Sequence, residues 1–142
     1  MTFVSITRLR LRSLRWFPGF GIRTWLSQRA LVRSEGFIDG HVGAGPNLTF
    51  WTVSFWRDEE AMRGYRDSGD HRRAMPFLFD ACDEAAVHHW ITDGEPSVLV
   101  AASRMQGARL TRLKHPSPAH AAGQAWPDGK LPGFSPRLQP KT

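Results

Sequence analysis

The stretch LTFWTVSFW, residues 48–56, constrains the fold more than any other part of the chain. Its aromatic and β-branched residues are typical of a β-strand. Successive side chains of a strand point to opposite faces of a sheet, so this run predicts a strand that is buried on both faces. Helices on one side cover only one of these faces. A second sheet from an identical subunit is the simplest cover for the other face, and the sequence therefore predicts a homodimer.

Weaker patterns on either side of this strand complete the predicted fold. Pro18 and two glycines interrupt the chain before the first helix, and Pro76 is expected to kink or restart the last helical segment. The order is that of the ferredoxin-like βαββαβ fold, an antiparallel sheet with helices on one face. In chain order, the predicted elements are a strand at 3–11, a helix at 22–33, a short strand within 36–47, the strand at 48–56, helical segments after the acidic residues 58–60, and a strand at 84–92.

The positive charge of the chain is concentrated near its C-terminus. The net charge is +6, yet residues 1–95 hold 12 arginines and 12 acidic residues, whereas residues 96–142 hold seven basic residues and one acid, Asp128. Seven of the ten prolines also lie from Pro96 onward. We therefore predict a ferredoxin-like domain at 1–95 and a basic, mostly irregular extension at 96–142, without which the domain still folds. Such an extension could hold nucleic acid by charge alone, but a solvated segment or an arm on a partner subunit is favoured.

The expected location of the protein is a reducing cytoplasm. The sequence has a single cysteine, Cys82, which excludes an internal disulfide. Cys82 is expected to be a small buried residue rather than a nucleophile. No apolar run has the length that a transmembrane helix needs, so no membrane span is expected.

A longer block, LTFWTVSFWRDEEAMRGYRDSGDHRRAM, resembles the strand-then-helix segment of the dimeric α+β barrel superfamily. This superfamily includes antibiotic biosynthesis monooxygenases and bacterial heme-degrading monooxygenases. The segment ITRLRLRSLRWFPGFG is also similar to the N-terminal part of spheroidene monooxygenase-like proteins. The resemblance covers roughly residues 3–92. The features that carry the first likeness are the pair Phe55-Trp56, the acidic turn at 58–60, the helical aromatic Tyr65, and the Ser-x-x-His sequence from Ser68 to His71.

The resemblance implies a dimer with oxygenase-type chemistry on a hydrophobic, aromatic or polyene small molecule held between sheet and helices. In the heme-degrading members a histidine toward the end of this helix ligates iron. The matching position here is Met75, and His71 lies one turn earlier, which argues against heme degradation. Heme bound through His71 and cofactor-free oxygenation both stay open. The alternative function is a non-catalytic dimer of the same fold that binds a small molecule or heme, and a third is a dimerisation platform whose basic extension binds nucleic acid.

The two candidate catalytic residues are His71 and Tyr65. His71 is expected in the first turn of a helical segment, where the helix dipole disfavours the imidazolium form. A neutral ring serves as a general base or as a metal ligand. The competing interpretation is a histidine that bonds a backbone carbonyl at the edge of a helix. Tyr65 is the candidate donor to a developing oxyanion.

The candidate ligand-binding residues are mostly tryptophans and arginines. Arg29 and Arg33 lie one turn apart on an apolar arc and could grip a carboxylate or a heme propionate, or cover the core with their stems. The tryptophans could wall a flat pocket or belong to the core. His88 and His89 point to opposite faces of a strand, so at most one joins any site, and zinc is not favoured. The predicted ligand-binding set is Trp25, Arg29, Arg33, Trp51, Trp56 and Met75.

Overall fold

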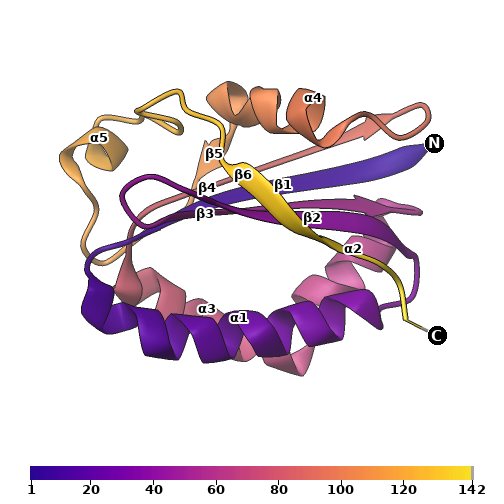
Figure 1. The fold of residues 1–142 in the computed structure, drawn as a ribbon, viewed down its shortest axis with the longest axis horizontal. Helices are drawn as coiled ribbons and strands as arrows, with labels where there is room; N and C mark the ends of the chain where they lie inside the picture. Colours follow the sequence, from indigo (N-terminus) through magenta and orange to yellow (C-terminus); the bar gives the residue numbers. More distant parts are fainter. Residues whose placement is uncertain (142) are drawn as a thin grey trace.

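A six-stranded antiparallel sheet organises the protein, and the computed structural model describes residues 1–141 of it. One layer of helices lies on each side of the sheet (Figure 1). The elements are β1 (Thr2–Leu11), η1 (Leu14–Trp16), α1 (Phe17–Val32), β2 (Phe37–Gly45), β3 (Thr49–Trp56), α2 (Glu59–Arg66), α3 (Gly69–Ala81), β4 (Cys82–Thr92), α4 (Val98–Ala102), η2 (Ser103–Gly107), β5 (Arg109–Leu110), α5 (Pro118–Ala121) and β6 (Gly133–Leu138).

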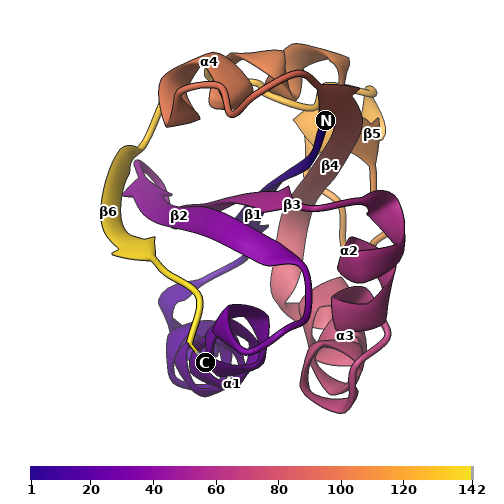
Figure 2. The same ribbon diagram turned by 90° about the vertical axis from the view of Figure 1, so that its right-hand side faces the viewer.

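The strand order confirms the ferredoxin-like fold. The sheet runs β5-β4-β1-β3-β2-β6, and its four inner strands have the order expected of a βαββαβ unit. The α1 helix connects β1 to β2, and α2 with α3 connects β3 to β4, so all three helices lie on the same side of the sheet (Figure 2). The strand at 49–56 is β3, which lies in the middle of the sheet between β1 and β2. Residues on both of its faces are buried, as predicted.

Neither Pro18 nor Pro76 separates two elements of the fold. The α1 helix begins at Phe17, so the FPGFG segment forms its first turn, with Pro18 among the first two helical positions. Proline is suited to these positions because their N–H groups have no partner within the helix. The α3 helix continues through Pro76, which is exposed, so water can reach the backbone group that the proline leaves unpaired.

Apolar residues pack between the sheet and the helices α1, α2 and α3 in two separate clusters. One lies where β3 ends and includes Phe3, Leu31, Phe37, Trp56 and Met62. The other lies at the opposite end of the strands and includes Leu11, Phe20, Ala81 and Cys82. Cys82 is buried, as expected, and burial raises the pKa of its thiol to about 12. The middle of this side of the sheet belongs to neither cluster.

The other face of the sheet is covered by the C-terminal segment of the same chain. Ala101, Ala102 and Met105 have no exposed surface and pack with the sheet residues Val4, Ile6, Trp51, Val53 and Phe55 in one core. The Trp126 ring meets Trp51 edge-on, with ring centroids 5.6 Å apart. We call residues 97–138 the covering segment. The division at residue 95 therefore separates the ferredoxin-like unit from its cover, and the expectation of a solvated tail is corrected because the tail buries apolar side chains.

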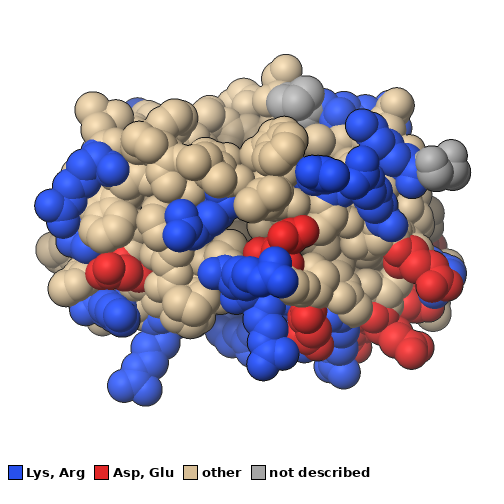
Figure 3. Space-filling model, turned by 90° about the horizontal axis from the view of Figure 1, so that it is seen from below, with Lys and Arg blue, Asp and Glu red and all other residues tan. Residues whose placement is uncertain are grey.

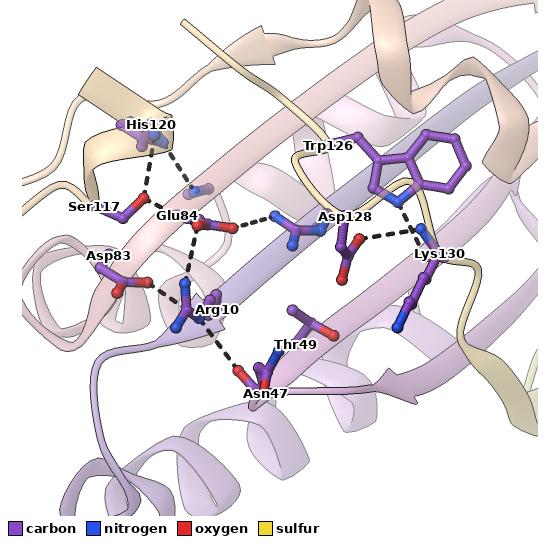
Figure 4. A network of polar contacts seen from close by, with 12 residues as sticks. Arg10, Asn47, Thr49, Asp83, Glu84, Ser117, His120, Trp126, Asp128 and Lys130 are labelled. Atoms are coloured by element: carbon purple, nitrogen blue, oxygen red, sulfur yellow. Dashed lines mark hydrogen bonds and ion pairs between the residues drawn. The ribbon is translucent and has the colours of Figure 1, made fainter. Parts of the chain in front are cut away.

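A buried polar network ties the covering segment to the sheet (Figure 4). Arg8 on β1 donates to Glu84 on β4 over 2.7 Å, and both side chains are almost completely buried. Ser117 Oγ donates to the other oxygen of Glu84 over 2.9 Å. The His120 backbone N–H donates to Ser117 Oγ, and the Ala85 N–H donates to His120 Nδ1. Although burial alone raises the pKa of Glu84, the bonds from Arg8 and Ser117 hold it below its ordinary value. The loop that carries Ser117 is thus held by charge-assisted hydrogen bonds.

Candidate active site

The middle of the helix-facing side of the sheet is polar. Ser5 pairs with both Ser54 and His89 and forms one row across β4, β1 and β3, and Thr7 with Thr52 forms the adjacent row, which continues with Val87 on β4. Ser5, Thr7 and Thr52 keep some solvent-accessible surface although helices lie over this side. We call Ser5, Thr7, Thr52, Ser54 and His89 the polar floor. Because it lies between the two apolar clusters, it is the part of the sheet where a small molecule can meet hydrogen-bonding groups.

Three rings from different elements pack together beside the polar floor. Trp56, at the end of β3, stacks on Tyr65 of α2 with ring centroids 5.6 Å apart and 29° between the planes. Tyr65 in turn lies 4.9 Å from the ring of His71, in the first turn of α3. Trp56 Nε1 donates to Ser54 Oγ over 2.9 Å, which joins the stack to the floor. The structure therefore brings together the three residues Trp56, Tyr65 and His71 that the sequence proposed for a single site.

His71 has the properties of a neutral imidazole. Burial is the main cause that lowers its pKa below the ordinary value of 6.5. Its Nδ1 lies 3.1 Å from the carbonyl oxygen of Arg66, and since a carbonyl can only accept, Nδ1 carries the proton. Nε2 then holds the free lone pair of the ring. The hydrogen bond that the competing interpretation predicted is thus present, and it fixes the tautomer that a general base needs.

Tyr65 and Ser68 supply hydroxyl groups beside His71. Burial is the main cause that raises the pKa of the Tyr65 phenol well above its ordinary value, and a hydrogen bond with Ser27 of α1 opposes the rise. Tyr65 is therefore a hydrogen-bond donor at neutral pH. Ser68, the residue that precedes α3, has a buried Oγ with no hydrogen-bond partner in the described part of the chain. A buried hydroxyl without a partner is costly unless a ligand or water completes it.

Trp51 does not belong to this site, which corrects the sequence-based prediction. It lies on the face of the sheet that the covering segment packs against, with Trp126 and Phe134. Trp56 lies on the helix side. The two tryptophans are five residues apart on one strand, and an odd separation puts side chains on opposite faces.

The predicted binding residues of α1 face away from the sheet. Trp25 is 60 % exposed, and Arg29, whose guanidinium lies 5.6 Å from the Trp25 ring, is exposed with Arg33. The residues of α1 that are buried are Phe20 and Leu31. The arc that seemed apolar in the sequence is therefore the outer side of the helix. Met75, on α3, is half-buried.

The sequence-based site lacked the polar floor. The sequence suggests no role for His89 beyond that of a metal ligand, and the structure places its ring near Phe3 with ring centroids 5.4 Å apart. Burial is the main cause that lowers its pKa. His88 lies on the other face, stacked on Trp90, as the alternation of strand side chains requires. The signal that could have found the floor is the run of Ser and Thr at alternate positions of β1 and β3, which marks one face of each strand.

The candidate residues do not fit a heme. Arg29 and Arg33, proposed to hold its propionates, are on the outer side of α1, and Trp51 lies across the sheet from His71. No group of three or more His, Cys, Asp or Glu side chains within residues 1–141 could hold a metal ion. In the same range, no helix is long and apolar enough to cross a membrane.

Neither a family model nor a curated protein matches the sequence. Solved structures do match the fold. Rv0793 from Mycobacterium tuberculosis aligns with a TM-score of 0.61 and 12% identity over 68% of this chain and 100% of its own. A variant of SnoaB, a cofactor-independent oxygenase from Streptomyces nogalater, aligns with a TM-score of 0.55 and 10% identity over 66% and 95%. A predicted antibiotic biosynthesis monooxygenase from Nitrosomonas europaea gives 0.58 and 9% over 65% and 99%. The chain therefore has the ferredoxin-like α+β fold that antibiotic biosynthesis monooxygenase-like proteins share, as its sequence predicted.

Proposed function

We propose that the protein is a monooxygenase-type enzyme that oxidises a hydrophobic, electron-rich aromatic or polyene small molecule at the polar floor. The observation that carries the proposal is the packing of the Trp56, Tyr65 and His71 rings against one another, which puts a neutral imidazole and a buried phenol together beside this floor. The Trp56 and Tyr65 rings supply flat apolar surface, and the floor supplies hydroxyl groups that orient the substrate.

His71 acts as the general base in this proposal. Its Nε2 removes a proton from the substrate and leaves an electron-rich anion. Tyr65 donates a hydrogen bond to the oxygen on which negative charge develops. Molecular oxygen is the oxidant, and the substrate itself supplies the electrons. For an activated CH₂ group, one oxygen atom becomes the new carbonyl and the other leaves as water with the two hydrogens of the substrate.

Oxygen uptake with an anthrone as the probe tests this proposal, because the anthrone has an activated CH₂ group and its quinone product absorbs light. The expected result is uptake by the wild-type protein and a loss of about 10²–10⁴-fold in His71→Ala, the usual contribution of a general base. His88→Ala is the matched control, since His88 lies on the opposite face of the same sheet. Equal rates in His71→Ala and wild type would contradict the role of His71.

The alternative is a non-catalytic protein that binds a hydrophobic small molecule. The hydrogen bond between His71 and the Arg66 carbonyl favours it, because a purely structural histidine makes the same bond. Tight binding of the anthrone without oxygen uptake would support this alternative.

A further inference from the structure

The α1 helix has its apolar and polar sides inverted at mid-length. Thr24 and Ser27 are half-buried, whereas Ile22 is 62 % exposed and Trp25 is 60 % exposed. An ordinary surface helix buries its large apolar side chains and exposes its polar ones. The polar inner side is explained by the polar floor beneath it. The apolar outer side has no explanation within the fold.

The exposed apolar residues continue along one line of the helix layer. Leu14, in η1, is 71 % exposed, and Pro18, Ile22, Trp25 and Arg29 follow at spacings of three or four residues. Residues at these spacings lie on one side of a helix. We call Leu14, Pro18, Ile22, Trp25 and Arg29 the outer stripe. It puts a tryptophan and two large aliphatic side chains in water in a single row.

The charged residues that neighbour the outer stripe in the sequence are all arginines, although Asp70 of α3 lies in the groove beside Ile22. Residues 1–34 contain seven arginines and no acidic residue. Among the described residues, no ion pair involves Arg15, Arg29 or Arg33. Seen from the helix side, the upper half of the surface carries basic and neutral groups, whereas acidic groups lie at mid-height and below, interspersed with further basic groups (Figure 3). The partner of the stripe is therefore apolar and anionic.

We propose that the outer stripe docks the protein on an anionic lipid surface. Tryptophan and leucine next to arginine are the residues that bind the boundary between headgroups and acyl chains. The arginines would contact lipid phosphates, while Ile22 and Trp25 enter the apolar boundary. A second copy of the chain fits less well, because a two-fold contact of the stripe with itself would bring arginines opposite arginines.

A groove lies beside the stripe, between α1 and the start of α3. It has a volume of about 290 Å³ and is lined by Ile22, Arg23 and Leu26 from α1 and by Asp70, Arg73 and Ala74 from α3. His71 follows Asp70 in the chain. If the proposed function holds, a hydrophobic substrate dissolved in the lipid would meet the protein on this side. The docking itself does not depend on the reaction.

Flotation with lipid vesicles tests the docking on the full-length protein. One set of vesicles is phosphatidylcholine alone and the other is an equal mixture of phosphatidylcholine and phosphatidylglycerol. We expect binding to the mixed vesicles that weakens as salt is raised, because salt screens the arginine–phosphate attraction. The double variant Ile22→Ser/Trp25→Ser should lower the partition coefficient by at least about tenfold, since it removes the apolar contact. Arg29→Gln should lower it less.

Matched controls come from the opposite helix layer. Val100 on α4 is also 59 % exposed, and Arg104 lies 4.9 Å from the Trp90 ring as Arg29 lies beside Trp25. Val100→Ser and Arg104→Gln should bind vesicles as the wild type does. Absence of vesicle binding by the wild type, or equal binding by the double variant, overturns the proposal. The proposal is also overturned if the wild type is a dimer in solution that only the double variant dissociates, or if the protein binds polyglutamate and not vesicles. Because all five substituted side chains are exposed, an unchanged melting temperature confirms that each variant folds.

Discussion

The Tyr65 ring lies against the His71 ring, with centroids 4.9 Å apart and planes inclined by 56°. One residue comes from α2 and the other from the start of α3, so the short turn between these helices sets their distance. Both groups are in the protonation state that the proposed reaction needs, because burial disfavours the charged form of each. The predictions below test this pair and the elements that support it.

Tyr65→Phe should separate catalysis from packing. The variant keeps the ring that stacks on Trp56 and loses only the hydroxyl group. We expect kcat for the anthrone probe to fall by about 10²-fold, the effect of removing one donor to an oxyanion. The free energy of unfolding should change by about 1 kcal/mol at most, the value of one net hydrogen bond. An unchanged kcat would show that Tyr65 serves only as packing.

His71→Ala should leave the protein folded. The side chain is half-buried and makes one hydrogen bond to a backbone carbonyl, so we expect a loss of about 1 kcal/mol in urea unfolding. Met75→Ala should cost about 1–2 kcal/mol, because Met75 is also only half-buried and a small cavity results. A much larger loss for His71→Ala would identify it as a structural residue.

The stability of the protein should fall as the solution becomes acidic. His71 and His89 both have a pKa below the ordinary value of 6.5 in the folded protein. The unfolded chain then binds more protons than the folded one as the pH drops below about 6.5, and stability decreases with it. Urea unfolding at a series of pH values should show this loss, and it should be smaller in the double variant His71→Gln/His89→Gln.

Glu84→Gln should be strongly destabilising. It keeps the shape of the side chain but leaves the buried Arg8 without its counter-charge, a change that costs about 3–5 kcal/mol. Asp80→Asn is the matched control, because Asp80 pairs with Arg12 at the surface and its side chain is 39 % exposed. That control should cost under about 1 kcal/mol. Similar losses for the two variants would mean that Arg8 finds another partner.

Removal of the covering segment should abolish the soluble fold. Without residues 97–141, Val4, Ile6, Trp51, Val53 and Phe55 would face solvent. A chain that ends at Pro96 should therefore aggregate or pair through this face, whereas light scattering of the full chain should give a monomer near 16.0 kDa. A stable monomer of the shortened chain would support the independent domain that the sequence predicted. A dimer of the full-length chain would support the predicted homodimer.

Local patterns were sufficient to predict the sheet and its helices. The alternation in β1 and β4 and the aromatic run in β3 gave the strand positions to within two residues, because side-chain period is a local property. The acidic turn before α2 was also informative, since Asp58 accepts a hydrogen bond from the Ala61 N–H as an N-cap. The resemblance of residues 48–75 to the dimeric α+β barrel superfamily also predicted that His71 and Tyr65 lie in one site.

Long-range packing could not be predicted in the same way. The apolar arc of α1 pointed to Trp25 as an inner residue, but the helix turns its Thr24 and Ser27 side inward because the sheet beneath it is polar. The covering segment was overlooked because its buried residues are mostly small, such as Ala101 and Ala102, and its elements are short. Proline content indicated irregular backbone, which says nothing about burial.

The attachment of the covering segment to the sheet it covers changes how the fold depends on protein concentration. A sheet face that is closed by a second chain is closed by mass action, and such a protein loses its structure on dilution. Here only the short connection from Asp93 to Pro96 separates β4 from the cover. The two surfaces meet at the high effective concentration of a tethered pair. The native fold should therefore persist unchanged at the lowest concentration at which the protein can be detected.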